Sequence, residues 1–449
     1  MNTAEDTKQL APWTDTVPTG WRVVRLDAAA DVLFSNVDKH TIDGETLVRL
    51  CNYVDVYKNG RITSGIDFME ASAEEREIRK FQIRQGDVLA TKDSEEADDI
   101  AIPSLVAEDL PGVLCGYHLA MIRPRLTAVS GAFLGWLHAS KSFRAQYEAK
   151  AVGVTRFGLS QYAFRAARVP LPPLPEQQRI ASYLDASCAA IDAAVAVKRR
   201  QLEILDVVRQ SVIERAVTRG MSARTELRAI DQDWIGSLPE HWTATRIKRV
   251  ISRVDYGISV SSEQEGTYPV LKMGNIQAGE IVFSKMEFVD DVIDELLLDT
   301  NDLLYNRTNS PDQVGKAALF RGSKDDHVTF ASYLVRLRVN HRIIPEFLNY
   351  VVNSGGFLAF ARRLAIPSVQ QSNLNSTRYC RLMIPLPPVT EQHAICEHVA
   401  AKVGELKGVF STIEAQIATL IAYRKSLIHE CVTGQRRIAE ADLNRVSHG

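Results

Sequence analysis

Two loops of this chain carry side chains that can make paired hydrogen bonds to nucleic-acid bases. Each loop follows a short strand-like segment, GDVL in the first half and NDLL in the second. The first loop, at 90–99, contains Thr91 and Lys92, and the second, at 305–316, reads YNRTNSPDQVGK. Arginine, asparagine and lysine read base edges in the DNA major groove by such bonds. The loops differ completely, as two readers of different sequences would require. An ordinary polar surface loop is the alternative for any one residue.

Positive charge is concentrated in two stretches, although the chain has a formal net charge of −2. Acidic residues dominate 67–109 and 287–302, whereas 141–168 holds six basic residues and one acid. The stretch 355–381 holds four arginines and no acid. One basic patch is often a solvated face, but two patches at equivalent places, mixed with Gln and Asn, favour contact with DNA. The predicted DNA-contacting residues are Thr91, Lys92, Lys141, Arg144, Arg156, Gln161, Arg165, Asn306, Arg307, Thr308, Asn309, Lys316, Arg362, Arg363, Gln370, Gln371 and Asn373.

The sequence contains no set of residues that would assemble a catalytic centre. It lacks a glycine-rich phosphate loop, a Gly-x-Gly-x2-Gly dinucleotide turn and the Asn/Asp-Pro-Pro-aromatic motif of amino-methyltransferases. Pro311-Asp312 has no nearby Glu-x-Lys, which a nuclease would need. His393, Cys396 and His398 have a spacing that suits no tetrahedral zinc site. We therefore predict no catalytic residue and no metal site, with the six scattered cysteines as buried, reduced thiols.

The segments that must position these residues occur twice. Trp13, Pro18 and Trp21 return as Trp234, Pro239 and Trp242 with the same internal spacing. PLPPLPEQQRI at 170–180 returns as PLPPVTEQHAI at 385–395, and RQSVIERAVT returns as RKSLIHECVT at the same shift of 215. Each half therefore has a lead-in segment, a variable domain, a proline-rich hinge and a long helix.

After each hinge, apolar residues recur at alternating steps of three and four for about 40 residues, the a/d pattern of a coiled coil. A helix of that length is about 60 Å long, so two packed side by side would form a rigid spacer. Lys198, Arg209 and Arg424 interrupt the apolar seam and either fix its register or extend to water at its edge. The seam residues predicted for this spacer are Ile191, Leu202, Leu205, Leu406, Ile413, Ile417 and Leu420.

A chain of 449 residues is too long for one hydrophobic core. Strand-like runs at 47–56, 270–276 and 328–339 predict an α+β fold with two repeated mixed α/β domains, separated by a pair of long antiparallel coiled-coil helices. The predicted boundaries are 1–169, 170–220, 221–384 and 385–449. No apolar run suggests a membrane span and no signal peptide is evident, so we expect a cytoplasmic protein.

The doubled Pro-Leu-Pro-Pro-x2-Glu-Gln-x2-Ile hinge before a long helix resembles the specificity subunit of type I restriction–modification systems. The doubled Trp-x4-Pro-x2-Trp segment and the Asn306–Lys316 loop resemble it too. The resemblance extends over essentially the whole chain and implies two target recognition domains, each reading one half of a bipartite, asymmetric site in double-stranded DNA. Lys92-Asp93-Ser94 stands where Arg307-Thr308-Asn309 stands, which we interpret as a difference in target.

The resemblance also implies partners. Two modification subunits would dock on the helix pair and use S-adenosylmethionine to methylate adenine, and restriction subunits would use ATP and Mg to translocate and cut DNA. This chain itself would bind no cofactor. Two alternatives stay open: a fused methyltransferase–endonuclease, which would need motifs that the sequence lacks, and a protein-binding scaffold, which the near-neutral charge fits.

Overall fold

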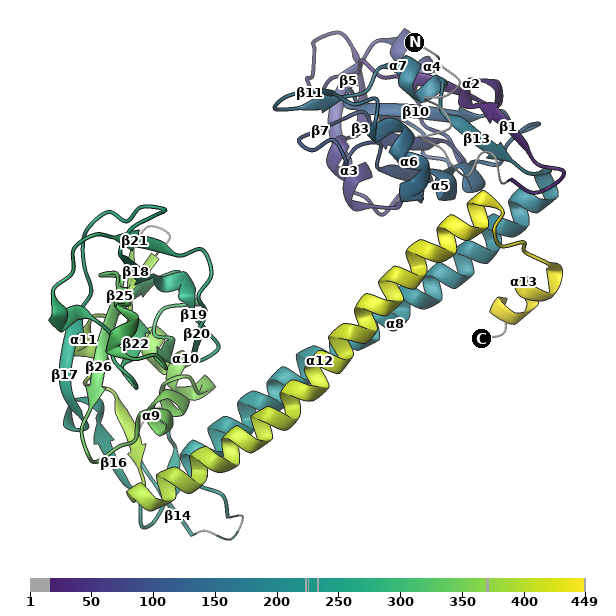
Figure 1. The fold of residues 1–449 in the computed structure, drawn as a ribbon. Coiled ribbons are helices and arrows are strands. Elements are labelled where there is room, and N and C mark those ends of the chain that lie inside the picture. Colours follow the sequence, from purple (N-terminus) through teal and green to yellow (C-terminus); the bar gives the residue numbers. More distant parts are fainter. Residues whose placement is uncertain (1–16, 223, 225, 232–233, 369–370, 448–449) are drawn as a thin grey trace. The chain divides into compact units, whose positions relative to one another are not determined.

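The computed structural model describes residues 17–222, 224, 226–231, 234–368 and 371–447. The chain divides into two compact units (Figure 1). Unit 1 comprises Met1–Lys198 with Ala415–Gly449, and unit 2 comprises Arg199–Glu414. Each unit contains one variable domain and parts of both long helices.

The central sheet of unit 1 has five strands in the order β2-β10-β6-β8-β4. Two three-stranded sheets and one strand pair accompany it. The central strands are β2 (Ala30–Phe34), β10 (Leu119–Pro124), β6 (Val88–Thr91), β8 (Pro103–Val106) and β4 (Arg61–Ile62). The others are β5 (Met69–Ala73), β3 (Thr46–Cys51), β9 (Val113–Cys115), β11 (Val152–Gly153), β12 (Phe157–Gly158), β7 (Asp93–Ser94), β1 (Arg22–Arg25) and β13 (Arg168–Leu171). The short helices are α2 (Leu26–Ala29), α3 (Tyr53–Lys58), α4 (Glu75–Phe81), α5 (Gly131–Ala139), α6 (Lys141–Glu148), α7 (Gln161–Arg165) and α13 (Glu440–Ser447).

Unit 2 repeats this plan with a sixth strand on the central sheet, in the order β17-β26-β22-β24-β20-β19. These strands are β17 (Ile251–Tyr256), β26 (Leu334–Val339), β22 (Leu303–Asn306), β24 (Ala317–Leu319), β20 (Glu280–Ile281) and β19 (Ile276–Gln277). The others are β21 (Glu287–Val289), β18 (Tyr268–Leu271), β25 (Thr329–Phe330), β23 (Thr308–Asn309), β28 (Gln371–Asn373), β27 (Ile366–Ser368), β16 (Thr243–Arg246), β29 (Met383–Leu386), β14 (Leu227–Ala229) and β15 (Ser237–Pro239). The short helices are α9 (Pro345–Val352), α10 (Gly355–Arg363) and α11 (Ser376–Tyr379).

The predicted strands are shorter than the sequence pattern suggested. The run 47–56 is a strand only to Cys51, because Asn52 begins helix α3 and forms a capping box with Asp55. The run 328–339 is divided into β25 and β26, and the run 270–276 forms only the end of β18 before a 3-10 turn. Local capping and turns here override β-propensity.

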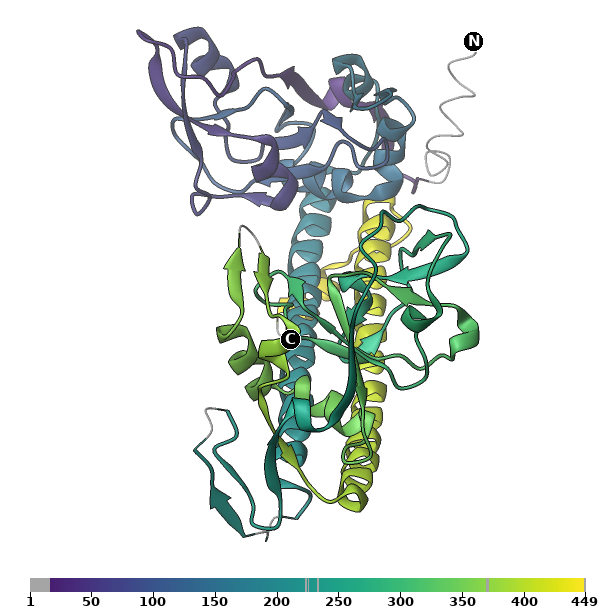
Figure 2. The same cartoon turned by 90° about the vertical axis from the view of Figure 1, so that its left-hand side faces the viewer.

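The two predicted long helices are present as α8 (Leu174–Arg219) and α12 (Val389–Thr433), which lie side by side in opposite directions (Figure 1, Figure 2). In unit 1, Lys198 Nζ donates to Gln416 Oε1 at 2.6 Å, and Arg424 pairs with Asp192 at 2.9 Å. Two of the three interruptions of the seam therefore connect the two helices, whereas Arg209 pairs with Asp206 of its own helix at 2.6 Å. The predicted α+β fold with two repeated domains and paired antiparallel helices is confirmed.

Glycine terminates both long helices in a left-handed backbone conformation. Gly220 after α8 and Gly434 after α12 adopt φ of +71° and +80°, which L side chains rarely adopt. A Cβ on Gly434 would lie 2.5 Å from Pro18 Cδ, and one on Gly220 would lie 3.4 Å from the Trp242 ring. Each helix thus ends against the lead-in segment of a unit, α12 in unit 1 and α8 in unit 2.

The hinge glutamate explains why tryptophan and the hinge motif are repeated together. In unit 1, Trp21 Nε1 donates to Glu176 Oε2 at 3.1 Å. In unit 2, Trp242 Nε1 donates to Glu391 Oε2 at 2.9 Å. Both indoles are buried, so each needs a partner for its N–H group.

The hinge glutamine closes the same junction. Gln177 is fully buried, accepts from Ser130 N at 2.8 Å and donates to Pro172 O at 2.8 Å. Gln392 makes the equivalent bonds, including one to Pro387 O at 2.9 Å. Because these amides satisfy buried backbone groups, they tie each variable domain to the start of a long helix.

The first half of α8 passes a length-and-composition test for a membrane-spanning helix, with a mean hydropathy of 1.5 over 18 residues. The sequence pattern predicted no such span. Core helices of soluble proteins pass the same test. Here Ile191 and Val195 belong to the apolar core of unit 1 together with Leu427 and Ile428 of α12. This packing accounts for the apolar seam of α8.

Candidate nucleic-acid interface

A lysine stacked on aromatic rings marks the end of β6 in unit 1. Thr91, the last residue of β6, is buried, and its Oγ1 accepts from Ile102 N at 3.0 Å. The next residue, Lys92, places Nζ 4.3 Å from the Tyr117 ring centroid and 5.1 Å from that of Phe34. Burial lowers the pKa of Lys92, and the charge of Asp93 opposes that effect. The ammonium is thus held by cation–π contacts beside a sheet edge.

Asp93 connects this lysine to the β11–β12 hairpin. Its Oδ2 lies 2.9 Å from His118 Nδ1, and its other oxygen forms an ion pair with Arg156 at the tip of the hairpin. Tyr117 and Arg156 are exposed. A cation, an aromatic ring and an arginine therefore gather at one surface of unit 1.

Unit 2 places Arg307 at the corresponding point after β22. Its guanidinium lies 5.2 Å from the Tyr256 ring centroid, and its Nη1 donates to Ser332 O at 3.2 Å. Arg307 Nε and Asn306 Oδ1 are buried and have no hydrogen-bond partner within the described part of the chain. Unpaired buried polar atoms are uncommon and mark places where another molecule or water can bind.

The two cation–aromatic pairs occupy the same sheet register. Phe34 lies opposite Ala120, and Tyr256 lies opposite Val335, the residue that matches Ala120 at the shift of 215. Lys92 and Arg307 match at that shift as well. The two units therefore have a cation stacked on an aromatic ring at the same position of the central sheet, but the cation and the ring differ between them.

The structure gathers most of the predicted residues of the second half around the Asn306–Lys316 loop. Asn373 Nδ2 donates to Thr308 Oγ1 at 2.9 Å, across the β23–β28 pair. Asn309 and Gln371 lie on the same small sheet. Lys316 Nζ donates to Gln313 Oε1 at 2.6 Å.

Arg362 lies at the base of this loop, and its Nε donates to Val314 O at 3.4 Å. Burial lowers the pKa of both Lys316 and Arg362, and for Lys316 the positive charge of Arg362 adds to this effect. Arg363 lines a separate pocket, and Gln370 lies outside the described residues.

The predicted residues of the first half are more dispersed. Arg144 is half-buried, donates to the carbonyls of α5 and lines a cavity beside the long helices. Lys141 lies 4.0 Å from Asp98, Gln161 Nε2 donates to Val32 O at 2.8 Å, and Arg165 lines a shallow pocket. Arg156 is linked to the segment of Lys92 by its ion pair with Asp93.

The predicted helix residues lie along the seam with different degrees of burial. Ile191 and Ile413 are buried, and the other five are partly buried, namely Leu202, Leu205, Leu406, Ile417 and Leu420. An apolar stripe of α8 faces solvent instead. Ile204, Val207 and Val208, at helical spacing of three and four, are 52%, 68% and 43% exposed.

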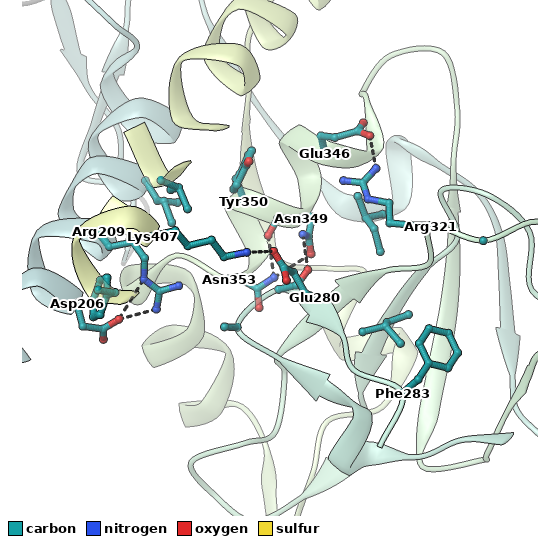
Figure 3. A pocket seen from close by; sticks show the side chains of 18 of the residues that line it. Asp206, Arg209, Glu280, Phe283, Arg321, Glu346, Asn349, Tyr350, Asn353 and Lys407 are labelled. Carbon is teal, nitrogen blue, oxygen red and sulfur yellow. Dashed lines mark hydrogen bonds and ion pairs between the residues drawn. The ribbon is translucent and has the colours of Figure 1, made fainter. Parts of the chain in front are cut away.

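Each unit has a cavity where its variable domain meets the long helices. The cavity of unit 2, about 600 Å³, lies between α9 and the helix pair (Figure 3). Its charged side chains neutralise one another, as in the pairs Lys407–Glu280 and Arg321–Glu346 at 3.1 and 2.5 Å. The cavity is therefore a polar junction. The equivalent junction of unit 1 contains Arg61, which pairs with Asp185.

Within the described ranges, no group of three or more His, Cys, Asp or Glu side chains is placed to hold a metal ion. All six cysteines are free, and five are buried. Burial raises the pKa of the Cys188 and Cys380 thiols to about 11.

The sequence alone did not point to a binding role for the aromatic partners Phe34, Tyr117 and Tyr256, nor for Asp93 and His118. The signal available was faint, because Phe34 and Tyr256 lie on strands and Tyr117 lies in a turn, all far from the cations in sequence. Only the strand pairing brings them within reach. The two copies of the lead-in segment are 221 residues apart, whereas the two copies of the hinge are 215 residues apart. No single offset therefore aligns the whole of both halves, and the correspondence of Phe34 with Tyr256 is not evident from the sequence.

The chain is similar in sequence to several known proteins. Residues 56–201 match the family model described as the type I restriction modification DNA specificity domain. The EcoKI specificity subunit of Escherichia coli K12 is 24% identical over 69% of this chain and 65% of its own length. The MjaVIII specificity subunit of Methanocaldococcus jannaschii is 21% identical over 94% of both chains. A second protein of that archaeon, assigned as the MjaX specificity subunit, is 27% identical, over 44% of this chain and 47% of its own length. The match thus spans about half to two thirds of the length of two of these three relatives.

Solved structures share the fold. A chain from a structure that describes complex assembly and conformational transition of the type I R-M system has a TM-score of 0.69 at 18% identity, over 93% of this chain and 98% of its own. The HsdS subunit from Thermoanaerobacter tengcongensis has a TM-score of 0.51 at 18% identity, over 94% and 98%. The shared architecture has two mixed-sheet α+β domains and a pair of long helices. The chain is thus similar in sequence to type I restriction–modification specificity subunits, and its fold is that of the two solved structures.

Proposed function

We propose that this chain is the non-catalytic DNA-recognition subunit of a type I restriction–modification complex. Each variable domain reads one half of a bipartite, asymmetric site in double-stranded DNA. The observation that carries the proposal is the repeated cation–aromatic pair, Lys92 on Phe34 and Arg307 on Tyr256, at one register of two otherwise different domains. The sheet is the same in both domains but the cation differs, as expected if the two domains recognise different base sequences.

The paired helices are proposed to fix the length of the unread gap between the two half-sites. They run as uninterrupted helices of 46 and 45 residues, and Lys198 and Arg424 link them by polar contacts. A stiff pair keeps a constant separation, unlike a flexible linker.

The helices are also proposed to dock two modification subunits, which would use S-adenosylmethionine to methylate adenine. Restriction subunits would join that core and use ATP and Mg. The exposed stripe of Ile204, Val207 and Val208 supports a docking role, because a continuous apolar stripe in contact with water is unfavourable unless a partner covers it. The assembly would work on cellular DNA in the cytoplasm.

The proposal is tested by mapping methylated adenines in a host that expresses this chain with its modification subunits. We expect one bipartite motif with a fixed gap. Inserting seven residues into both α8 and α12 lengthens the helices by about 10 Å, which corresponds to about three base pairs. Both half-sequences should be retained and the gap should lengthen. An unchanged gap would refute the spacer role, and methylation without a common motif would refute recognition by this chain.

A further inference from the structure

Four arginines line one open pocket of unit 2. The pocket belongs neither to the Asn306–Lys316 loop, called the reading loop below, nor to the junction with the helices. The pocket is about 720 Å³, and Arg246, Arg363, Arg378 and Arg381 contribute their side chains to its wall. Among the described residues, no aspartate or glutamate lines it. Four like charges beside one cavity repel one another, so an anion bound there would stabilise the fold.

These arginines lack the carboxylate partners that several other arginines of unit 2 have. Arg253, Arg321, Arg336 and Arg338 each form an ion pair with a carboxylate. None of the four pocket arginines forms an ion pair within the described part of unit 2. The pocket therefore has a positive charge that the chain does not neutralise.

Two of the four guanidinium groups are held in place by their neighbours. Arg378 Nη1 donates to Leu364 O at 2.9 Å, and the Arg363 guanidinium lies 5.3 Å from the Phe360 ring centroid. A guanidinium fixed in this way loses little conformational freedom when it binds a phosphate through its remaining N–H groups.

The pocket borders the sheet that carries the reading loop. Ile366 and Pro367, which line it, belong to β27. Strand β27 pairs with β28, and β28 pairs with β23, which contains Thr308 and Asn309. A duplex read by that sheet would bring its sugar–phosphate backbone close to the pocket.

Unit 1 has basic residues at the equivalent place. Arg25 lies opposite Arg168 on the β1–β13 pair, in the register where Arg246 lies opposite Met383 on β16–β29. Lys150 is close enough for the charges of Arg25 and Arg168 to lower its pKa, after the larger effect of burial. Here Asp27 pairs with Arg25 at 2.6 Å, so the charge is partly neutralised.

We propose that the arginine pocket of unit 2 binds backbone phosphates of the DNA that the reading loop contacts, and supplies affinity independent of sequence. This inference rests on the proposed function. Phosphate contacts fix a protein on the duplex without reading bases. The weaker basic cluster of unit 1 would contribute less.

The test uses the chain in complex with its modification subunits and two duplexes, one with the methylation-mapped site and one of random sequence. Binding is measured over a range of salt concentrations. The triple variant Arg363→Gln/Arg378→Gln/Arg381→Gln should lose about 100-fold in affinity equally on both duplexes near physiological salt. The slope of log affinity against log salt should become shallower by roughly two to three, about 0.9 for each lost phosphate. The matching Lys variant retains the charges and should recover most of that slope, which separates charge loss from misfolding.

Arg321→Gln is the matched control, because it removes one positive charge from unit 2 where Glu346 already pairs with it. Its slope should equal that of the wild type. An unchanged slope in the triple Gln variant, or a loss confined to the specific duplex, would overturn the inference. Inorganic phosphate at matched ionic strength is tested as a separate ligand. If it stabilises the wild type but not the triple Gln variant, and the salt slope of DNA binding is the same for both, the pocket binds free phosphate. That result would also overturn the inference. If the wild type does not distinguish the two duplexes, the proposed function fails instead.

Discussion

Arg336 donates to Asp255 across the neighbouring strands β26 and β17, with Nη2 and Oδ2 2.7 Å apart. The arginine side chain is fully buried and also donates to the carbonyls of Glu295 and Leu297. In unit 1 the same register is occupied by Met121 opposite Leu33. One repeat thus uses an ion pair where the other uses apolar packing.

This difference predicts how unit 2 tolerates substitution. Arg336→Met should destabilise it by about 1–3 kcal/mol, because Asp255 then keeps only Arg253 and the carbonyls of Glu295 and Leu297 lose their donor. The double variant Asp255→Leu/Arg336→Met copies unit 1 and should lie within about 1 kcal/mol of the wild type or above it. Urea denaturation of the full chain measures both. A double variant as unstable as the single one would contradict the prediction.

The same pair predicts acid sensitivity. Burial alone would raise the pKa of Asp255, but hydrogen bonds from Arg336 and Arg253 outweigh it, and the net pKa is lowered. A carboxyl with a lowered folded-state pKa stabilises the fold above its unfolded pKa and loses that contribution as pH falls through the folded value. The wild type should therefore lose stability below about pH 4, where the unfolded-state carboxyl titrates. The Asp255→Leu/Arg336→Met variant should lose less over the same range in denaturation at stepwise lower pH, and parallel losses would rule out this pair as the cause.

Ion pairs of opposite polarity connect the two variable domains to their helices. In unit 1, Arg61 of β4 pairs with Asp185 of α8 at 2.5 Å, and in unit 2, Glu280 of β20 pairs with Lys407 of α12 at 3.1 Å. Both pairs are substantially exposed, so a double-mutant cycle to alanine should give a coupling of about 0.2–1 kcal/mol for each. Arg61→Ala alone keeps the bond of 2.7 Å from Trp136 Nε1 to Asp185. The coupling free energy between Arg61 and Asp185 should vanish in 1 M salt, because salt screens exposed charges. A coupling that does not depend on salt would indicate packing instead.

Arg307 and Arg156 should contribute to specificity. Arg307→Ala should weaken binding to the mapped site by ~1–3 kcal/mol, if it contacts a base, with a smaller loss on random DNA. Arg156→Ala should act on the other half-site in the same way. Competition binding with duplexes altered in one half at a time assigns each arginine to a half. Equal losses on specific and random DNA would identify phosphate contacts.

Subunit assembly should depend on the exposed stripe of α8. Ile204→Asp/Val207→Asp should abolish co-purification of modification subunits, because burying two carboxylates without partners is costly. Thermal unfolding of the chain should change little, since both side chains are more than half exposed. Arg199→Asp, an exposed residue on the same helix, is the matched control. Assembly that survives the double substitution would place the docking surface elsewhere.

The repeats and the long helices could be predicted from the amino-acid order because both are local or periodic. The Trp, Pro, Glu and Gln of the lead-in and hinge recur at fixed offsets, and their bonds, such as Trp21 to Glu176, form the same junction in both units. The a/d spacing predicted α8 and α12 because side-chain direction follows helix geometry directly. The predicted contact residues of the second half lie close together largely because they are near neighbours in the chain.

Tertiary structure alone decided which cations stack on which rings. Lys92 meets Phe34 and Tyr117, and Arg307 meets Tyr256, through strand pairings between distant segments that carry no periodic signal. It also directed Arg144 toward the helix junction and placed Arg246 beside Arg378, across more than a hundred residues. Sequence determines local geometry, whereas the meeting of distant side chains depends on sheet register and on the packing of the whole unit.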